Sequence, residues 1–151
     1  MTPALIAIAL FGGSFALIGG IVGTNILFNA RKRDKSVHGV LIHSSPFPAK
    51  VIDEEIDRVL GVLHDIDPRL MDALDRILSS VEITYGPGDY ILDSWGNKTN
   101  GHVIGARIFV ADKGGVSIRR TALAHELAHV ALHAADGDPD GAHGHAVFRV
   151  L

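Results

Sequence analysis

The sequence predicts an α+β domain in which a short three-stranded sheet lies beside one nearly all-apolar helix, preceded by a single transmembrane helix. Three observations support this fold class. Residues 3–28 carry no charge, residues 51–80 show the apolar spacing of two amphipathic helices, and residues 81–134 place β-branched segments ahead of a helical one. A small sheet and helices that bury their apolar faces against it form a two-layer α+β arrangement.

The composition limits the chemistry that the chain can use. The 151 residues have a formal net charge of −3 and include no cysteine. This length accommodates about one domain of roughly 100–150 residues and an appendage. Without cysteine there are no disulfides or thiolate ligands, so a metal site must use histidine and carboxylates. Basic residues are dispersed apart from one cluster at 31–35, so no nucleic-acid partner is predicted.

The apolar run at residues 3–28 is 26 residues long. As a helix it exceeds the roughly 30 Å hydrocarbon core of a bilayer. We therefore predict a transmembrane anchor over residues 1–30 that contacts the lipid bilayer. A secretory signal peptide is the alternative, although here the basic residues follow the apolar run instead of preceding it.

The basic cluster also predicts an orientation. Lysine and arginine prefer the cytoplasmic side of a membrane, and RKRDK directly follows the apolar run. The expected location is the cell membrane, single-pass, with the C-terminal domain in the cytoplasm. Within the run, Gly19 and Gly23 have GxxxG spacing. This spacing favours self-association, or it reflects the general frequency of glycine in membrane helices.

Residues 31–50 are predicted to be a basic juxtamembrane segment and linker, because two prolines and several small residues follow the basic cluster. The domain at 51–151 then begins with two helices. Apolar residues recur at helical spacing over 51–63 and again over 70–78. Asp67 is expected to cap the second helix and Pro68 to begin it.

Three strands are predicted at 81–84, 89–95 and 106–112, because these segments are rich in β-branched and aromatic residues and are separated by GPG and GNKTNG turns. His102 falls between the last two strands and is expected in a loop. Ser117 is predicted to cap a helix over 118–134 that stops at DGDPDG. A further helix is expected from about residue 144 to the last residue.

The predicted central helix contains HELAH at residues 125–129. In a helix His125 and His129 lie about 40° apart and one turn along the axis, so both imidazoles reach one ion. Glu126 projects beside them. A catalytic zinc has three protein ligands and a water, and a neighbouring glutamate takes the proton of that water. The alternative is a fortuitous match on a surface helix, but a buried histidine pair needs a partner such as a metal.

TALAHELAHVALH at 121–133 resembles the active helix of compact zincin metallopeptidases, including the ImmA/IrrE type, the zincin-like domain of ArdC antirestriction proteins and the SprT-like group. The preceding GARIFVADKGGVSIRR is similar to their edge strand and loop. DGAHGHAVF near the end resembles the SprT-like HGxxF segment with its third histidine ligand. The resemblance implies a zincin-like domain over 51–151 that binds Zn²⁺.

The same resemblance assigns roles to residues. It implies that His125 and His129 are metal ligands, that Glu126 is the catalytic base, and that His143 is the third ligand, with His145 as the alternative. Relatives place an aromatic residue four positions after that ligand, whereas Phe148 lies five after His143 and three after His145. His133, one turn beyond the motif, is expected to lie past the ion and to face the end of the helix.

Two functions follow from this pattern. The first is a membrane-anchored zinc metallopeptidase that hydrolyses peptide bonds in a protein or peptide substrate, which would pair with an edge strand at 106–112. The second is a membrane or assembly protein whose zincin fold holds a structural, non-catalytic zinc. A structural site has no use for a general base beside an open ligand position, so Glu126 favours the enzyme.

Overall fold

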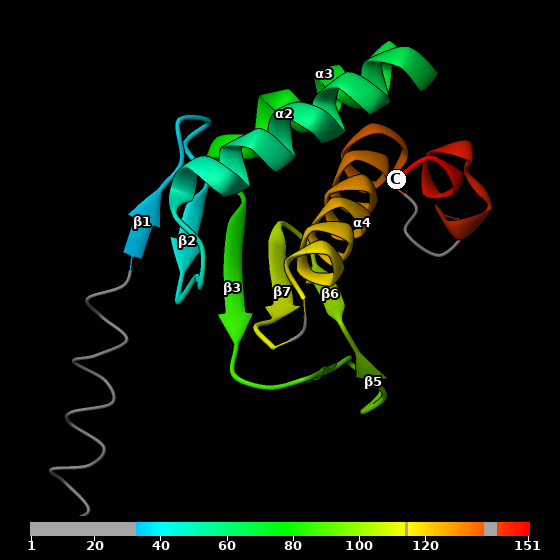
Figure 1. The fold of residues 1–151 in the computed structure, drawn as a ribbon. Coiled ribbons are helices and arrows are strands. Elements are labelled where there is room, and N and C mark those ends of the chain that lie inside the picture. The colour runs from blue at the N-terminus through cyan, green and yellow to red at the C-terminus, as the bar shows by residue number, and fades with distance from the viewer. Residues whose placement is uncertain (1–32, 114, 138–141) are drawn as a thin grey trace, which may run out of the picture. The chain divides into compact units, whose positions relative to one another are not determined.

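The computed structural model describes residues 33–113, 115–137 and 142–151. In this part of the chain, helices α2 (Ala49–Ile66), α3 (Pro68–Ile77) and α4 (Val116–Asp136) pack against one another and against a mixed five-stranded sheet. Figure 1 shows α2 and α3 running across one end of the strands and α4 alongside β7 and β6. These elements belong to one compact unit, Arg33–Leu151.

The sheet has the strand order β1 (Arg33–Lys35), β2 (Leu41–His43), β3 (Glu82–Gly86), β7 (Arg107–Ala111) and β6 (Gly101–Ile104). The pairs β2–β3 and β3–β7 are parallel, and the two outer pairs are antiparallel. Parallel neighbours need a crossover connection, which α2 and α3 provide between β2 and β3. This order places β6 at the edge of the sheet nearest to α4.

The two amphipathic helices form where the sequence predicts them. The Asp67 carboxylate accepts a hydrogen bond from the Arg69 backbone N–H at 3.0 Å, and Pro68 is the first residue of α3. A side-chain oxygen at this position satisfies an N–H group that the helix leaves unpaired. The predicted boundary between the two helices is therefore confirmed.

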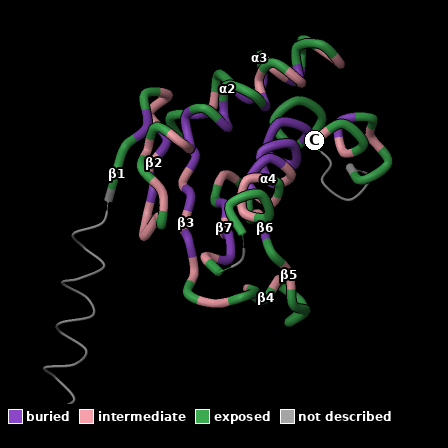
Figure 2. The backbone as a smooth tube through the Cα atoms, viewed as in Figure 1, coloured by how far each residue is buried: buried purple, intermediate pink, exposed green. Residues whose placement is uncertain are grey.

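The middle of helix α4 is buried, as Figure 2 shows by its buried stretch. Its buried residues run without interruption from Glu126 to Leu132. The helix begins after Gly115, which makes no side-chain cap, so the prediction that Ser117 is the N-cap was wrong. It ends at Gly137, whose φ of +75° is the left-handed conformation typical of a helix end.

The predicted three-stranded sheet was wrong, because the sheet has five strands. Strands β1 and β2 come from residues 33–43, which were predicted to be a linker, and β6 comes from residues 101–104, which were predicted to be a turn and a loop. His102 therefore lies in a strand. Strands of three or four residues are too short for their alternation to be recognised. They form because neighbouring strands pair with them.

The predicted strand at 89–95 is mostly a turn. Only β4 (Ile91–Leu92) is extended, and it pairs with β5 (Lys98–Thr99) in a separate two-stranded sheet. The Asp93 side chain accepts hydrogen bonds from the backbone N–H groups of Trp95 and Asn97, which bends the chain after β4. Asp and Asn favour such turns because they bond to nearby backbone.

The expected helix after residue 144 is also replaced by shorter structure. Two 3₁₀ turns are present, η2 (Ala142–Gly144) and η3 (Ala146–Arg149), and Val147 of η3 is buried in the core. A further 3₁₀ turn, η1 (Leu78–Ser80), extends α3. Turns of this kind rarely exceed four residues because their hydrogen-bond geometry is poorer than that of an α-helix.

The predicted transmembrane anchor falls on residues 1–30 and lies outside the described residues, as do Gly19 and Gly23. Among residues 33–113, 115–137 and 142–151, no helix combines the length and apolar character needed to cross a membrane. The fold class is therefore corrected: the described chain is an α+β domain of three α-helices and a mixed five-stranded sheet.

Candidate metal centre

Three histidine side chains meet at one point between α4 and η2. The Nε2 atoms of His125 and His129 lie 3.2 Å apart, and His143 Nε2 lies 3.2 Å from the first and 3.1 Å from the second. Tetrahedral zinc with bonds of 2.0–2.1 Å would separate its nitrogen ligands by roughly 3.3 Å. The three nitrogen atoms therefore lie within metal-binding distance of one another.

This arrangement cannot be satisfied by hydrogen bonds alone. The Nε2 atom of a neutral imidazole either carries a hydrogen and donates, or lacks one and accepts. Among three mutually adjacent atoms at least two must be of the same kind, so at least one of the three contacts is not a hydrogen bond. A cation at the centre would accept a lone pair from each nitrogen. The donor set therefore fits a metal ion.

Burial keeps two of these imidazoles neutral. Burial, with a smaller contribution from His143, lowers the pKa of His125. Burial, followed by the neighbouring His125 and His143, lowers the pKa of His129 to about 4. Removal from water and a nearby positive charge both disfavour the protonated ring. At neutral pH both rings therefore have a free lone pair, which is the state that binds a metal.

Phe148 closes one side of the cluster. Its ring centroid lies 4.7 Å from those of His125 and His129, and 5.3 Å from that of His143. Phe148 belongs to η3, so the 3₁₀ turns bring both the third histidine and the aromatic ring to α4. The side chain of His145, the alternative third ligand, has another contact: its Nδ1 accepts the backbone N–H of Val147.

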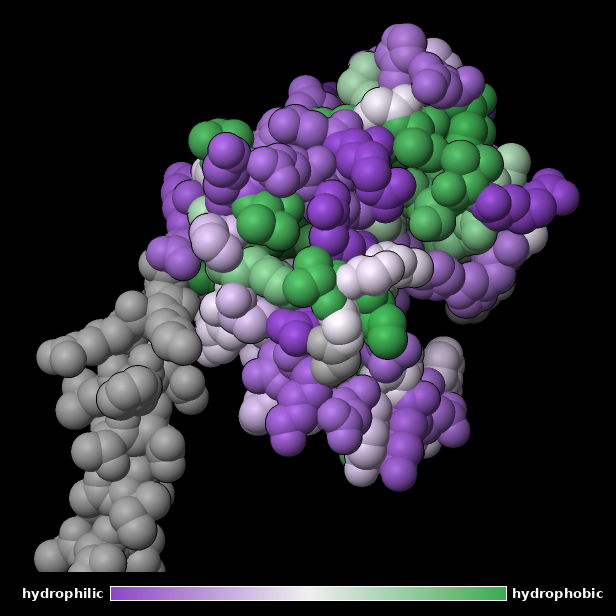
Figure 3. Space-filling model, viewed as in Figure 1, coloured by the Kyte–Doolittle hydropathy of each residue, from purple (hydrophilic) through white to green (hydrophobic). Residues whose placement is uncertain are grey.

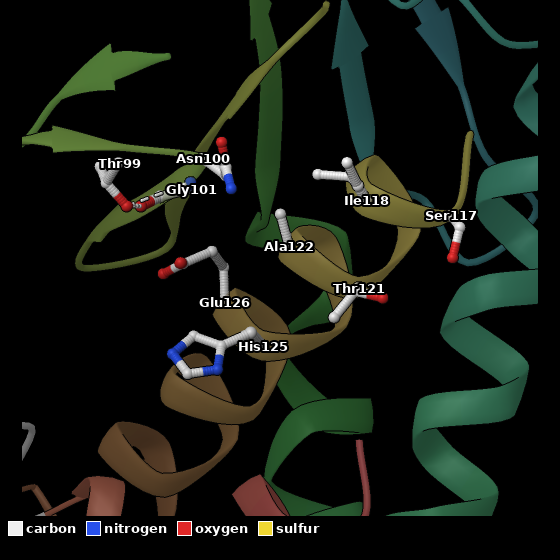
Figure 4. Close-up of a pocket in the computed structure, with 9 residues that line it drawn as sticks. All are labelled: Thr99, Asn100, Gly101, Ser117, Ile118, Thr121, Ala122, His125 and Glu126. Atoms are coloured by element: carbon white, nitrogen blue, oxygen red, sulfur yellow. Dashed lines mark hydrogen bonds between the residues drawn. The ribbon is translucent and has the colours of Figure 1, made fainter. Parts of the chain in front are cut away.

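Glu126 lies on the same helix, one residue after His125, and is only 6% exposed. Figure 4 shows the Glu126 side chain extending from α4 toward the segment Thr99–Gly101, with the His125 ring beside it. Burial raises the pKa of Glu126 to about 7. A carboxyl group that titrates near neutral pH can both accept and release a proton, which is the property of a general base.

Gly101 of β6 gives Glu126 its space. A Cβ atom on Gly101 would lie 2.7 Å from Glu126 Oε1 and 2.9 Å from its Cγ. No ordinary side chain fits at these distances, so glycine lets the edge strand approach α4 closely. The position of the carboxylate is therefore set by β6 as well as by its own helix.

Two adjoining clefts give access to the cluster. One has a volume of about 450 Å³, and its lining includes all three histidines, Glu126, His102 and Trp95. The other, of about 360 Å³, extends toward the start of α4 past Ile118 and Ala122. Both include Thr99, Gly101, His125 and Glu126, so these residues lie where the two clefts join.

The edge strand of this site is β6, and the prediction of an edge strand at 106–112 was wrong, because β7 lies between β3 and β6. The backbone N–H of Ala111 donates to the Asn100 carbonyl, which makes this a hydrogen-bonded pair. In an antiparallel ladder the next pairs alternate, so the backbone N–H and C=O groups of Gly101 and Val103 point away from β7. They face the cleft side of the sheet edge.

The structure therefore brings together His125, Glu126, His129 and His143, while His133 is exposed one turn further along α4. Sequence reasoning missed Gly101, Trp95 and the strand position of His102. The available signal was the glycine that ends the polar segment at residues 96–100. Comparisons with models of known protein families, with curated protein sequences and with solved structures found no match.

Proposed function

We propose that this chain is a zinc-dependent metallopeptidase that hydrolyses peptide bonds in an extended protein or peptide segment. One observation supports the proposal above all: three histidine Nε2 atoms converge in the cleft that also holds the buried carboxyl group of Glu126. The HELAH spacing and its resemblance to compact zincins point in the same direction. An all-imidazole set of three ligands suits zinc, as in other hydrolytic sites.

The roles of the side chains follow from their positions. His125, His129 and His143 would hold the ion, and the metal-ligating group in the described residues includes no fourth side chain. A fourth side is therefore left for water or substrate. Zinc, when bound in such a site, activates water and polarises a carbonyl group. Glu126 would accept a proton from the attacking water and deliver it to the leaving amine.

The edge of the sheet supports a peptide as the substrate. The Thr99 hydroxyl bonds to the outward C=O and N–H groups of Gly101, so the outward N–H and C=O groups of Val103 are the ones that an extended chain would pair with. A peptide paired with β6 would run through the cleft beside Glu126. Such pairing recognises a series of consecutive peptide groups. Small non-peptide esters and amides do not have such a series.

A structural zinc remains the competing function, and Glu126 argues against it. Structural zinc sites have four protein ligands, whereas the cluster formed by the described residues has three. A structural site also gains nothing from a buried carboxyl group, which costs free energy unless it is used. The proposal therefore assigns the burial of Glu126 to catalysis.

Removal and return of the metal tests the proposal directly. The zinc-loaded protein is expected to bind one zinc per chain and to degrade an unfolded protein substrate. A chelator should abolish cleavage and a stoichiometric amount of zinc should restore it, whereas Mg²⁺, which prefers oxygen ligands, should not. The measurements are metal analysis and gel-based substrate loss. Cleavage that resists the chelator, or zinc-loaded protein that cuts no peptide bond, would contradict the proposal.

Gly101→Ala is expected to lower peptide hydrolysis by about a hundredfold while zinc content stays the same. The added methyl group would displace the Glu126 carboxylate, and misplacement of a catalytic group by about 1 Å can cost this much. Gly61→Ala is the matched control, because nothing lies within 4 Å of a Cβ atom there. Unchanged activity in Gly101→Ala would show that the position of Glu126 does not matter.

A further inference from the structure

Trp95 is unusual because it lines the metal-site cleft and yet is 81% exposed. It is the only tryptophan in the sequence. Large aromatic side chains contribute most to the free energy of binding when they are removed from water. An exposed tryptophan that lines a cleft therefore has apolar surface available to a ligand. A ligand bound in this cleft would cover the indole.

The turn that presents Trp95 is held by its own hydrogen bonds. Asp93 Oδ1 accepts the backbone N–H groups of Trp95 at 2.9 Å and of Asn97 at 2.8 Å, and Asp93 Oδ2 accepts the side-chain amide of Asn97. Gly96 follows with a φ of +83°, a conformation that favours glycine. The backbone of Trp95 is therefore positioned before any ligand arrives.

The same turn is connected to the edge strand. Ser94 Oγ and His102 Nε2 of β6 lie 3.0 Å apart in a hydrogen bond. The Thr99 hydroxyl, at the end of β5, donates to the Gly101 carbonyl at 2.7 Å. These two contacts hold the β4–β5 hairpin against β6. A peptide paired with β6 would thus pass beside the indole.

The surroundings of Trp95 favour a peptide over a membrane surface. The lower lobe in Figure 3, where Figure 2 places β4 and β5, is largely hydrophilic. Asp93, Asn97 and Lys98 flank the tryptophan in the sequence. Insertion of Trp95 into a bilayer would take these polar groups toward the hydrocarbon, whereas contact with one side chain in the cleft would not.

We propose that Trp95 is a specificity-determining residue that contacts an apolar side chain of the substrate, aromatic or large aliphatic, within about three residues of the cleaved bond. The inference rests on the proposed peptidase function. Val103, which also lines the cleft, adds apolar surface. Side chains of an extended peptide alternate, with about 3.3 Å between residues, so one of them faces the indole.

Binding can be measured without catalysis because Trp95 is the sole tryptophan. The full-length Glu126→Gln protein, loaded with zinc, is titrated with octapeptides of an alanine and serine background that carry phenylalanine at one position. Excitation at a wavelength that neither phenylalanine nor the two tyrosines of the chain absorb reports Trp95 alone. The phenylalanine peptides are expected to shift its emission to shorter wavelength, and the matched serine peptides are not.

Kinetics with the active protein give the second measurement. Trp95→Ala is expected to raise KM about tenfold for the best phenylalanine peptide. The kcat for that peptide, and both constants for the serine peptide, should stay the same. Trp95→Phe should retain most of the preference for the phenylalanine peptide over the serine peptide. Val37→Ala, which removes an 85% exposed side chain in the turn between β1 and β2, is the control and should change nothing.

The outcomes separate this inference from the proposed function. A selective emission shift without any hydrolysis would contradict the peptidase proposal but support the apolar subsite at Trp95. Hydrolysis with equal KM values for phenylalanine and serine peptides would overturn the subsite and leave the peptidase standing. An emission shift on vesicles of phosphatidylcholine and phosphatidylserine, with none on phenylalanine peptides, would also overturn it and assign Trp95 to membrane contact.

Discussion

Glu126→Gln is expected to lower peptide hydrolysis by about 10²–10⁴-fold while the protein keeps its zinc, since this is the range that a general base contributes. Glutamine has nearly the same shape, so it fits the space beside Gly101, but it cannot take a proton from water. The buried position of Glu126 also means that a neutral side chain imposes no new desolvation cost. Thermal stability should therefore not fall. Initial rates with a peptide substrate and metal analysis of the same sample measure both quantities.

Glu82→Gln is the matched control for the same chemical change. Glu82 lies on β3, which β7 separates from β6, and it does not line either cleft; its side chain pairs with Arg107 at 3.7 Å in an exposed ion pair. Exposed pairs contribute little to stability, so this variant should resemble the wild type. Activity that survives Glu126→Gln would remove the general base from the proposal, and zinc lost together with activity would assign Glu126 a structural role instead.

His143→Ala is expected to weaken zinc binding by more than about a hundredfold, whereas His145→Ala should leave it nearly unchanged. Loss of a supporting partner of a ligand typically costs 10–100-fold in metal affinity, and loss of a ligand itself costs more. His143 Nε2 is within 3.2 Å of both other histidine nitrogens, whereas His145 Nδ1 accepts the Val147 N–H at the start of η3. Competition with a chromophoric chelator measures the two affinities.

Thermal unfolding gives an independent measurement of the same difference. A ligand present at 100 times its Kd adds about 2.7 kcal/mol to the free energy of unfolding. Zinc should therefore raise the Tm of the wild type and of His145→Ala, and should not raise that of His143→Ala at the same concentration. The reverse pattern would make His145 the third ligand and would require η2 and η3 to be arranged differently around Phe148.

Local spacing was enough to predict part of this site. In a helix the positions of His125, Glu126 and His129 relative to one another depend only on the pitch, and the structure places the two imidazole nitrogens 3.2 Å apart. The boundary at Asp67 and Pro68 was predictable for the same reason, because a cap and a proline act within one turn. Interactions of this range depend only on residues that are close together in the sequence.

The short strands were not predictable in this way. β1, β2 and β6 have three or four residues each, and β2 is extended because β3, about 40 positions later, pairs with it in parallel. The predicted edge strand at 106–112 became an inner strand for the same reason, since β6 pairs with its outer side. Short segments acquire their conformation from partners that are distant in sequence.

By itself, the sequence determined the relative positions of His125, Glu126 and His129 and the two amphipathic helices, because each depends on contacts within a few residues. Only the tertiary structure decided which later histidine joins them, how Gly101 makes room for Glu126, and which strand edge faces the cleft. His143, Gly101 and Trp95 reach the site through turns and strand pairing that bring separate segments to α4. Such contacts depend on the path of the whole chain, which no local pattern records.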